Sequence, residues 1–190
     1  QAFQPLPVAD GIRRIGGMAV GLLILEQAKS TPVLNKAISL IRALVSSNAK
    51  NLQEMKRISG FQTMGMLIRN RVRLCDQESV AALFDMAVEN QVISNSSALT
   101  KLFAFPVWRN ADKAILVAVF HSIVSLVANC EQKEFNIYRL RQLRIVPRLL
   151  NVVSDEAITD TVVGILTAVF DAKFDVDDLH MIATYMAAPS

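Results

Sequence analysis

The sequence has few of the residues on which disulfide-rich, turn-rich or fibrous proteins depend. Its 190 residues include only 2 cysteines, 7 glycines and 6 prolines. Cys75 and Cys130 lie far apart and form no C-x-x-C motif, which predicts two reduced thiols in a cytoplasmic protein, because disulfide frameworks belong to small secreted domains. With so little glycine and proline, few turns are available, and we expect most residues to lie in helices.

The sequence also lacks a segment that resembles a membrane anchor. The run Ile15–Leu25 has eleven uncharged residues after Arg13 and Arg14, but no small-residue cleavage site follows it, and it is too short to cross a bilayer. We expect a buried core helix there and no transmembrane segment. Because the chain begins at Gln1 and is apolar within its first turns, we expect it to be a fragment of a larger protein.

Residues that support catalysis are equally scarce. There are 2 histidines, and there is no P-loop, dinucleotide-binding or G-x-S-x-G motif. His180 follows two aspartates, an arrangement more typical of a solvated helix face than of a metal site. The sequence therefore predicts no enzyme, no cofactor and no metal site. A helical-bundle enzyme that uses His121 or His180 is the remote alternative.

Helical periodicity runs through the chain, and no segment alternates with the period of a strand. Apolar stripes set the expected helix bounds, with Asp10 as an N-cap. Either Asp76 or Gln77 opens one later helix, and either Ser154 or Asp155 caps another. The expected helices comprise residues 10–29, 31–45, 50–58, 60–71, 77–89, 111–130, 134–143, 147–153, 155–172 and 176–187. Before residue 111 we also expect a short helix that ends at Pro106, with Trp108 in the following loop.

Residues 111–130 form the most apolar segment and predict a central helix that is buried on several sides. Phe120, Ile123 and Leu126 are expected at the centre of the core. His121 lies in the same segment, and we expect it to be a core histidine whose hydrogen bonds are satisfied.

Part of the sequence occurs twice. Residues 51–58 (NLQEMKRI) and 136–143 (NIYRLRQL) share asparagine, an aliphatic residue, Met or Leu, a base, and Ile or Leu at matching positions. Each copy follows an apolar helix and leads into a second apolar stretch, with about three extra residues before Asn136. The offset of 85 residues is about twice the roughly 40–47 residues of a HEAT or armadillo repeat.

This duplication predicts an all-α protein without a β-sheet. The expected architecture is an armadillo/HEAT-like α-solenoid of stacked antiparallel helix pairs, in which residues 1–190 form one module. Solenoids usually bind and scaffold other proteins.

Charge is distributed unevenly along the chain. Residues 1–75 carry eleven bases against three acids, and residues 151–190 carry one base against seven acids. In a solenoid, equivalent positions line up along one face, so two arginine clusters predict a basic surface for acidic partners or anionic membranes. Its candidate residues are Arg69, Arg71, Arg73, Arg139, Arg141, Arg144 and Arg148. Residues 171–178 should form a negative surface.

An ordinary solvated face is the alternative to this basic surface. Aromatic residues are not interleaved with the bases, and arginine commonly covers helix surfaces with its apolar stem. Because aromatic residues are not interleaved with the bases, nucleic acid is the least favoured partner.

Residues 40–90 resemble a known family. Asn48, Asn51 and Met55, followed by the string ISGFQTMGML at residues 58–67, are similar to the armadillo-like region upstream of the BEACH domain in neurobeachin-type proteins. The resemblance implies a very large cytosolic scaffold that attaches peripherally to membranes and acts in vesicle traffic, lysosome-related organelles or autophagy. It brings no catalytic residues, and the BEACH domain and WD repeats have no counterpart in this chain.

The predicted function is therefore a non-catalytic helical-repeat module of a cytoplasmic trafficking scaffold. It would bind partner proteins, acidic ones among them, and touch anionic membranes peripherally. The alternative is an unrelated HEAT/armadillo adaptor, such as a transport receptor or a nucleic-acid-associated repeat protein.

Overall fold

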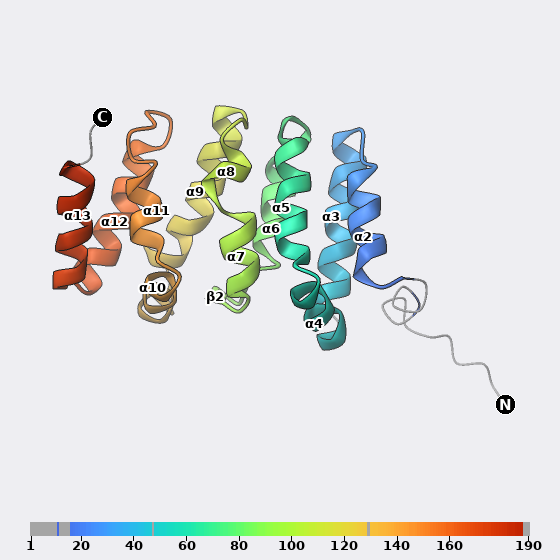
Figure 1. Cartoon of the computed structure of the whole chain (residues 1–190), viewed down its shortest axis with the longest axis horizontal. Helices are drawn as coiled ribbons and strands as arrows, with labels where there is room; N and C mark the ends of the chain where they lie inside the picture. Colours follow the sequence, from blue (N-terminus) through green and yellow to red (C-terminus); the bar gives the residue numbers. More distant parts are fainter. Residues whose placement is uncertain (1–10, 12–15, 47, 129, 188–190) are drawn as a thin grey trace. The chain divides into compact units, whose positions relative to one another are not determined.

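The computed structural model of the chain describes residues 11, 16–46, 48–128 and 130–187 (Figure 1). These residues are mainly helical, so the predicted all-α class is confirmed, and they form two compact units. Unit 1 is assigned residues 1–87 and 97–110, and unit 2 is assigned residues 88–96 and 111–190. The expected N-cap Asp10 lies outside the described residues.

Unit 1 consists of helices that pack against one another. Its elements are α2 (Met18–Glu26), α3 (Thr31–Ser46), α4 (Ala49–Arg57), α5 (Gly60–Asn70), the 3-10 helix η1 (Val72–Leu74), α6 (Gln77–Phe84), α7 (Ser96–Leu102) and α8 (Phe105–Trp108). Helix α3 packs against α2, α4 and α6, and α5 packs against α2, α4 and α8. The helices predicted at 31–45, 50–58 and 60–71 are thereby confirmed.

A polar network fixes the start of α6 against α3. Asp76, one of the two residues expected to open this helix, is its N-cap, and its carboxylate accepts a hydrogen bond from the backbone N–H of Ser79 at 2.9 Å. The side-chain amide of Asn35 donates to both oxygens of the same carboxylate, at 3.1 and 3.0 Å. Burial alone raises the pKa of Asp76, but these hydrogen bonds outweigh it and hold the pKa below its ordinary value.

Two expectations for unit 1 are wrong at their boundaries. The helix expected at 77–89 ends at Phe84, because Val88 enters a β-hairpin. Trp108 lies in a helix rather than in a loop, because Pro106 falls in the first turn of α8, where its missing N–H breaks no hydrogen bond. Trp108 is fully buried, and its Nε1–H donates to the carbonyl of Leu102 at 2.7 Å.

The described residues of unit 2 form a small hairpin and five helices. The hairpin pairs β1 (Val88–Glu89) with β2 (Val92–Ile93) in antiparallel register. The helices are α9 (Lys113–Val127), α10 (Lys133–Gln142), α11 (Ile145–Leu150), α12 (Thr159–Ala172) and α13 (Val176–Ala187). Helix α9 packs against α10 and α12, and α11 packs against α10, α12 and α13.

The hairpin corrects the expectation that the chain has no strand. Asn90 and Gln91 both have positive φ, 49° and 62°, as a two-residue type I′ turn requires. Asparagine tolerates this left-handed conformation better than most residues, and the flanking valines favour the extended strands. Four paired residues are too short a pattern for alternation to be recognised.

Helix α9 is the central helix of unit 2, as predicted. Phe120, Ile123 and Leu126 are 4%, 3% and 1% exposed, so their predicted burial is confirmed. The expectation for His121 is wrong, because this histidine is exposed. It lies on the side of α9 opposite the core, together with the exposed Ala114 and Ser125.

Two other boundaries in unit 2 differ from expectation. Helix α11 begins at Ile145, before Pro147, because a proline within the first turn needs no N–H donor. Helix α12 begins at Thr159, later than expected, because residues 151–157 form turns. Asp155 stabilises these turns by accepting a hydrogen bond from the backbone N–H of Ala157 at 3.0 Å.

The sequence duplication corresponds to a duplication of structure. In unit 1 the long helix α3 packs against the following short helix α4 and against α6, and α4 packs against α5. In unit 2 the long helix α9 packs in the same way against the short helix α10 and against α12, and α10 packs against α11. The series α3–α4–α5–α6 in unit 1 thus matches α9–α10–α11–α12 in unit 2. The residue before the third helix of each series is in the left-handed region of φ/ψ space. This residue is Ser59 before α5, with φ of 55°, and Arg144 before α11, with φ of 53°. Non-glycine residues seldom adopt this conformation, so its recurrence at an offset of 85 residues supports the match.

A buried asparagine makes the same bond in both copies. The side-chain amide of Asn51 donates to the carbonyl of Leu44 near the end of α3, at 3.1 Å. That of Asn136 donates to the carbonyl of Leu126 near the end of α9, at 3.2 Å. The two bonds span seven and ten residues, which confirms the predicted insertion of three residues before Asn136. This asparagine joins the short helix to the end of the long one.

Candidate functional site

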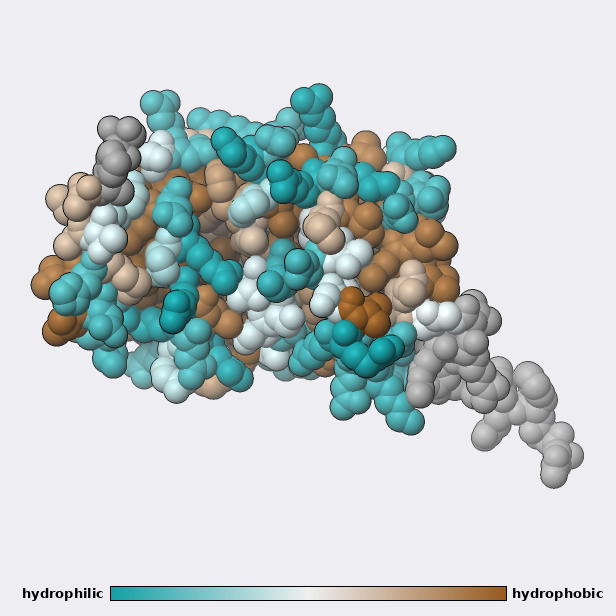
Figure 2. All heavy atoms as spheres, in the orientation of Figure 1, coloured by the Kyte–Doolittle hydropathy of each residue, from teal (hydrophilic) through white to brown (hydrophobic). Residues whose placement is uncertain are grey.

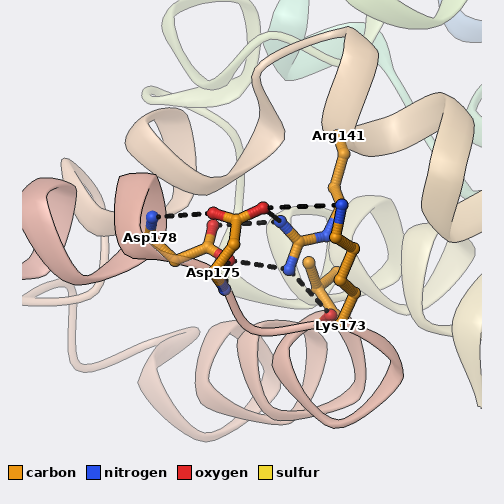
Figure 3. Close-up of polar contacts among 5 residues, drawn as sticks. Arg141, Lys173, Asp175 and Asp178 are labelled. Atoms are coloured by element: carbon orange, nitrogen blue, oxygen red, sulfur yellow. Dashed lines mark hydrogen bonds and ion pairs between the residues drawn. The ribbon is translucent and has the colours of Figure 1, made fainter.

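Arg141 on α10 fixes the start of α13 within unit 2 (Figure 3). Its guanidinium donates to both carboxylate oxygens of Asp178, at 3.1 and 2.8 Å, and Asp178 is only 1% exposed. It also donates to the carbonyl of Val169 at 3.3 Å. Bidentate geometry with a buried carboxylate makes this the strongest ion pair of the described residues.

The acidic partner of Arg141 also caps α13. The backbone N–H of Asp178 donates to the carboxylate of Asp175 at 3.2 Å, and the backbone N–H of Asp175 donates to that of Asp178 at 3.1 Å. This reciprocal pair satisfies two donors at the beginning of the helix. Arg141 therefore anchors a capping pair, and a long-range ion pair holds α13 in place.

A groove of about 580 Å³ lies beside this ion pair. Its walls come from α10, α11, the start of α13 and the segment before α13. The lining residues are Tyr138, Arg141, Gln142, Arg144, Val146, Pro147, Lys173, Asp175, Asp177, Asp178 and Met181. Its lining combines both signs of charge with apolar residues, which suits a peptide segment of mixed polarity better than a simple anion.

The seven predicted arginines fall into two groups by exposure. Arg69 and Arg73 in unit 1 and Arg144 and Arg148 in unit 2 are exposed. Arg71, Arg139 and Arg141 are half-buried. Each unit therefore keeps two of these arginines exposed, and their role in binding stays a prediction.

The half-buried arginines are engaged inside their own units. Arg71 donates to the carbonyl oxygens of Ala28, at 3.2 Å, and Glu26, so it satisfies acceptors at the end of α2. The guanidinium of Arg139 lies 5.5 Å from the centre of the Phe135 ring. These side chains have structural contacts that sequence reasoning did not assign.

The predicted negative surface over residues 171–178 needs a correction. Asp178 is buried rather than exposed, and Asp175 lies 3.8 Å from both Arg141 and Lys173. The exposed acids of that segment are Asp171 and Asp177. The spacing of two aspartates three residues apart before an apolar helix was the available signal for the capping pair.

Within the described ranges, no group of three or more His, Cys, Asp or Glu residues is placed to hold a metal ion. Cys75 is buried, and its burial, together with the neighbouring charge of Asp76, raises the pKa of its thiol to about 12. Every described helix is too short or too polar to cross a bilayer.

We expect Cys75 to resist alkylation in the folded protein. At neutral pH a thiol with a pKa of about 12 holds almost no thiolate, which is the reactive form. Iodoacetamide labelling at pH 7.5, followed by peptide mass spectrometry, should modify Cys75 far more slowly in buffer than in urea. Equal rates in the two conditions would contradict the buried environment.

Comparison with known proteins finds relatives along almost the whole chain. It is 21% identical over 197 aligned residues, 98% of its length, to the WD repeat- and FYVE domain-containing protein 4 of Homo sapiens. Over 48% of the chain it is 30% identical to Protein SPIRRIG, and over 42% it is 29% identical to BEACH domain-containing protein A2, both from Arabidopsis thaliana.

These relatives are BEACH-domain proteins, so the predicted resemblance is confirmed: the chain is related to a region of that group. The chain spans only 6% of the human protein and 3% and 2% of the two plant proteins. No family model matches the chain. No solved structure matches it either.

Proposed function

We propose that the chain is a non-catalytic helical-repeat module of a large membrane-trafficking protein. Its two units would stack as successive parts of an armadillo-like solenoid and present side chains to partner proteins. The observation that carries this proposal is the recurrence of one four-helix series, with the same buried asparagine and the same left-handed residue, in both units. Repeats of this kind bury a continuous core by stacking and leave their outer faces for binding.

The relatives support the trafficking context of the proposal. They are large BEACH-domain proteins, and the chain aligns with a small part of each. A module of this size within such a protein suits a scaffold role, with a cytoplasmic location at membrane surfaces.

The exposed arginines are the proposed contact residues for acidic partners. Arg144 and Arg148 border α11, and Arg144 also lines the groove beside the Arg141–Asp178 ion pair. Exposed bases speed the association of an acidic partner and orient it, and the binding weakens as salt rises. Against an anionic bilayer each base contributes only about 1 kcal/mol, so a pair of arginines gives weak attachment by itself.

Charge reversal tests these contacts. In fluorescence anisotropy with a labelled acidic peptide, and in flotation with phosphatidylserine vesicles, Arg144→Glu with Arg148→Glu should abolish salt-sensitive binding. The matched control, Lys29→Glu with Lys101→Glu, makes the same charge change at exposed lysines of unit 1 and should retain most of it. If both double variants lose binding equally, the binding depends on net charge alone and not on Arg144 and Arg148. If the unmodified chain does not bind, the proposed contacts are refuted.

A further inference from the structure

The turn between α4 and α5 carries a serine behind two bases. Lys56 and Arg57 end α4, and Ser59 follows at the N-cap position of α5. No other serine or threonine in the sequence has a base both three and two residues before it. All three residues are exposed, and Figure 2 shows hydrophilic residues gathered over α4. This spacing is a charge pattern by which one class of serine kinases selects its substrates.

The hydroxyl of Ser59 has no capping role. Its side chain makes no hydrogen bond to the start of α5, whereas the side chain of Asn48, the N-cap of α4, accepts the backbone N–H of Lys50 at 2.9 Å. The backbone explains the difference, because Asn48 is extended, as capping residues usually are, and Ser59 is left-handed, with φ of −149° and 55°. The hydroxyl can therefore react without the loss of a bond that holds the helix.

The backbone around Ser59 is held by bonds at two helix ends. Its N–H donates to the carbonyl of Lys56 at 3.2 Å, and its carbonyl accepts from the first turn of α5 at 3.0 and 3.1 Å. Bonds of this kind open at a lower free energy than those of a helix interior. A kinase takes its substrate as an extended segment, so residues 56–60 must straighten, while Met55 and Phe61 on either side stay buried in the core.

We propose that Ser59 is a phosphorylation site for a serine kinase that recognises bases before its target residue. In the kinase, the Oγ of Ser59 attacks the γ-phosphorus of ATP. The new O–P bond replaces the bond from that phosphorus to the β–γ bridging oxygen, ADP leaves, and the hydroxyl proton passes to the carboxylate base of the kinase. The phosphate adds a charge of about −1.5 to −2 at the start of α5, whose first turn contains no acid and favours a negative charge.

The second copy of the repeat cannot be modified at this position. Arg144 takes the place of Ser59 there, before α11 and with the same left-handed backbone. Phosphorylation would therefore give the two copies opposite charges at equivalent positions. In a helical-repeat module, such a change alters the charge of one repeat and leaves the other as it is.

Incubation of the folded chain with ATP and the catalytic subunit of the cyclic-AMP-dependent kinase, a kinase of this class, tests the site. Intact-mass and peptide mass spectrometry should find one phosphate per chain, on Ser59, and none in Ser59→Ala. The proposal is overturned if no phosphate appears or if it appears on another residue. It is also overturned if a synthetic peptide of residues 52–65 is modified and the folded chain is not.

Matched variants test recognition by the two bases. Arg57→Ala should slow phosphorylation by about tenfold or more, because it removes the charge two residues before the serine. Lys50→Ala removes an exposed base of the same helix that lies outside the recognised segment, and it should leave the rate nearly unchanged. Equal losses in both variants would mean that the kinase responds to net charge alone, and the proposal would be wrong. Circular dichroism of each variant checks that the helices are retained.

Discussion

Replacement of Arg141 by methionine should destabilise unit 2 by about 3–5 kcal/mol, because it leaves the carboxylate of Asp178 buried without a counter-charge. Asp178 is 1% exposed and receives two of its hydrogen bonds from the guanidinium of Arg141. The same change removes the only described ion pair that links α10 to the buried start of α13. Urea unfolding followed by circular dichroism measures the loss, and hydrogen exchange should show α13 losing protection first.

A double variant separates the lost charge from the lost packing. Asp178→Asn keeps a side-chain oxygen that can accept the backbone N–H of Asp175 but removes the buried charge. Arg141→Met combined with Asp178→Asn should therefore be markedly more stable than Arg141→Met alone. If the single variant loses less than about 1 kcal/mol, an ordinary surface effect, Arg141 does not anchor α13.

Replacement of Asn136 by leucine should have the second large effect, about 3 kcal/mol or more, because it leaves several buried polar groups without partners. Its side-chain amide donates to the carbonyls of Gln91 and Leu126 at 2.7 and 3.2 Å. Its side-chain oxygen accepts the backbone N–H of Ile93 at 3.0 Å. Asn136 thus joins the hairpin, α9 and α10, and it is fully buried.

The first copy of the repeat contains the matched control. The side-chain amide of Asn51 donates to the carbonyl of Leu44, and its own buried side-chain oxygen has no hydrogen-bond partner in the described part of the chain. Asn51→Leu should therefore cost only about 1 kcal/mol, the typical net value of one hydrogen bond. Equal losses from the two substitutions in urea melts would contradict the hydrogen-bond assignment of Asn136.

The helices and the duplication could be predicted because they depend on local patterns. The apolar stripe of a helix is set by residues three and four apart, and the repeat places the same side-chain types at the same positions. Met55 and Leu140, which match in the two copies, are both fully buried. Their shared burial needs no knowledge of distant contacts.

The candidate site could not be predicted in the same way. Arg141 and Asp178 are 37 residues apart, and the position that matches Arg141 in the first copy is the exposed Lys56. Sequence alone could not distinguish the base that anchors a helix from the one that faces water. The hairpin was missed because its turn depends on two positive φ angles at Asn90 and Gln91, where no glycine signals them.

The burial of His121 was predicted wrongly because the prediction rested on the apolar composition of its segment and not on the position of the histidine on the helix. Leu116, Val119, Phe120 and Ile123 fill the buried face of α9. His121 lies on the other side, with the exposed Ala114 and Ser125 and one turn from the half-buried Val117 and Val124. A helical wheel of these residues alone places the histidine toward solvent.

A crystal structure of the chain tests the central claim, the structural duplication, most directly. The account predicts that residues 51–67 and 136–150 superpose as equivalent units, with Asn51 and Asn136 buried against the ends of the preceding helices. It also predicts positive φ at Ser59 and Arg144. Two segments that do not superpose, or an asparagine turned to solvent in either copy, would contradict the duplication on which the proposed function rests.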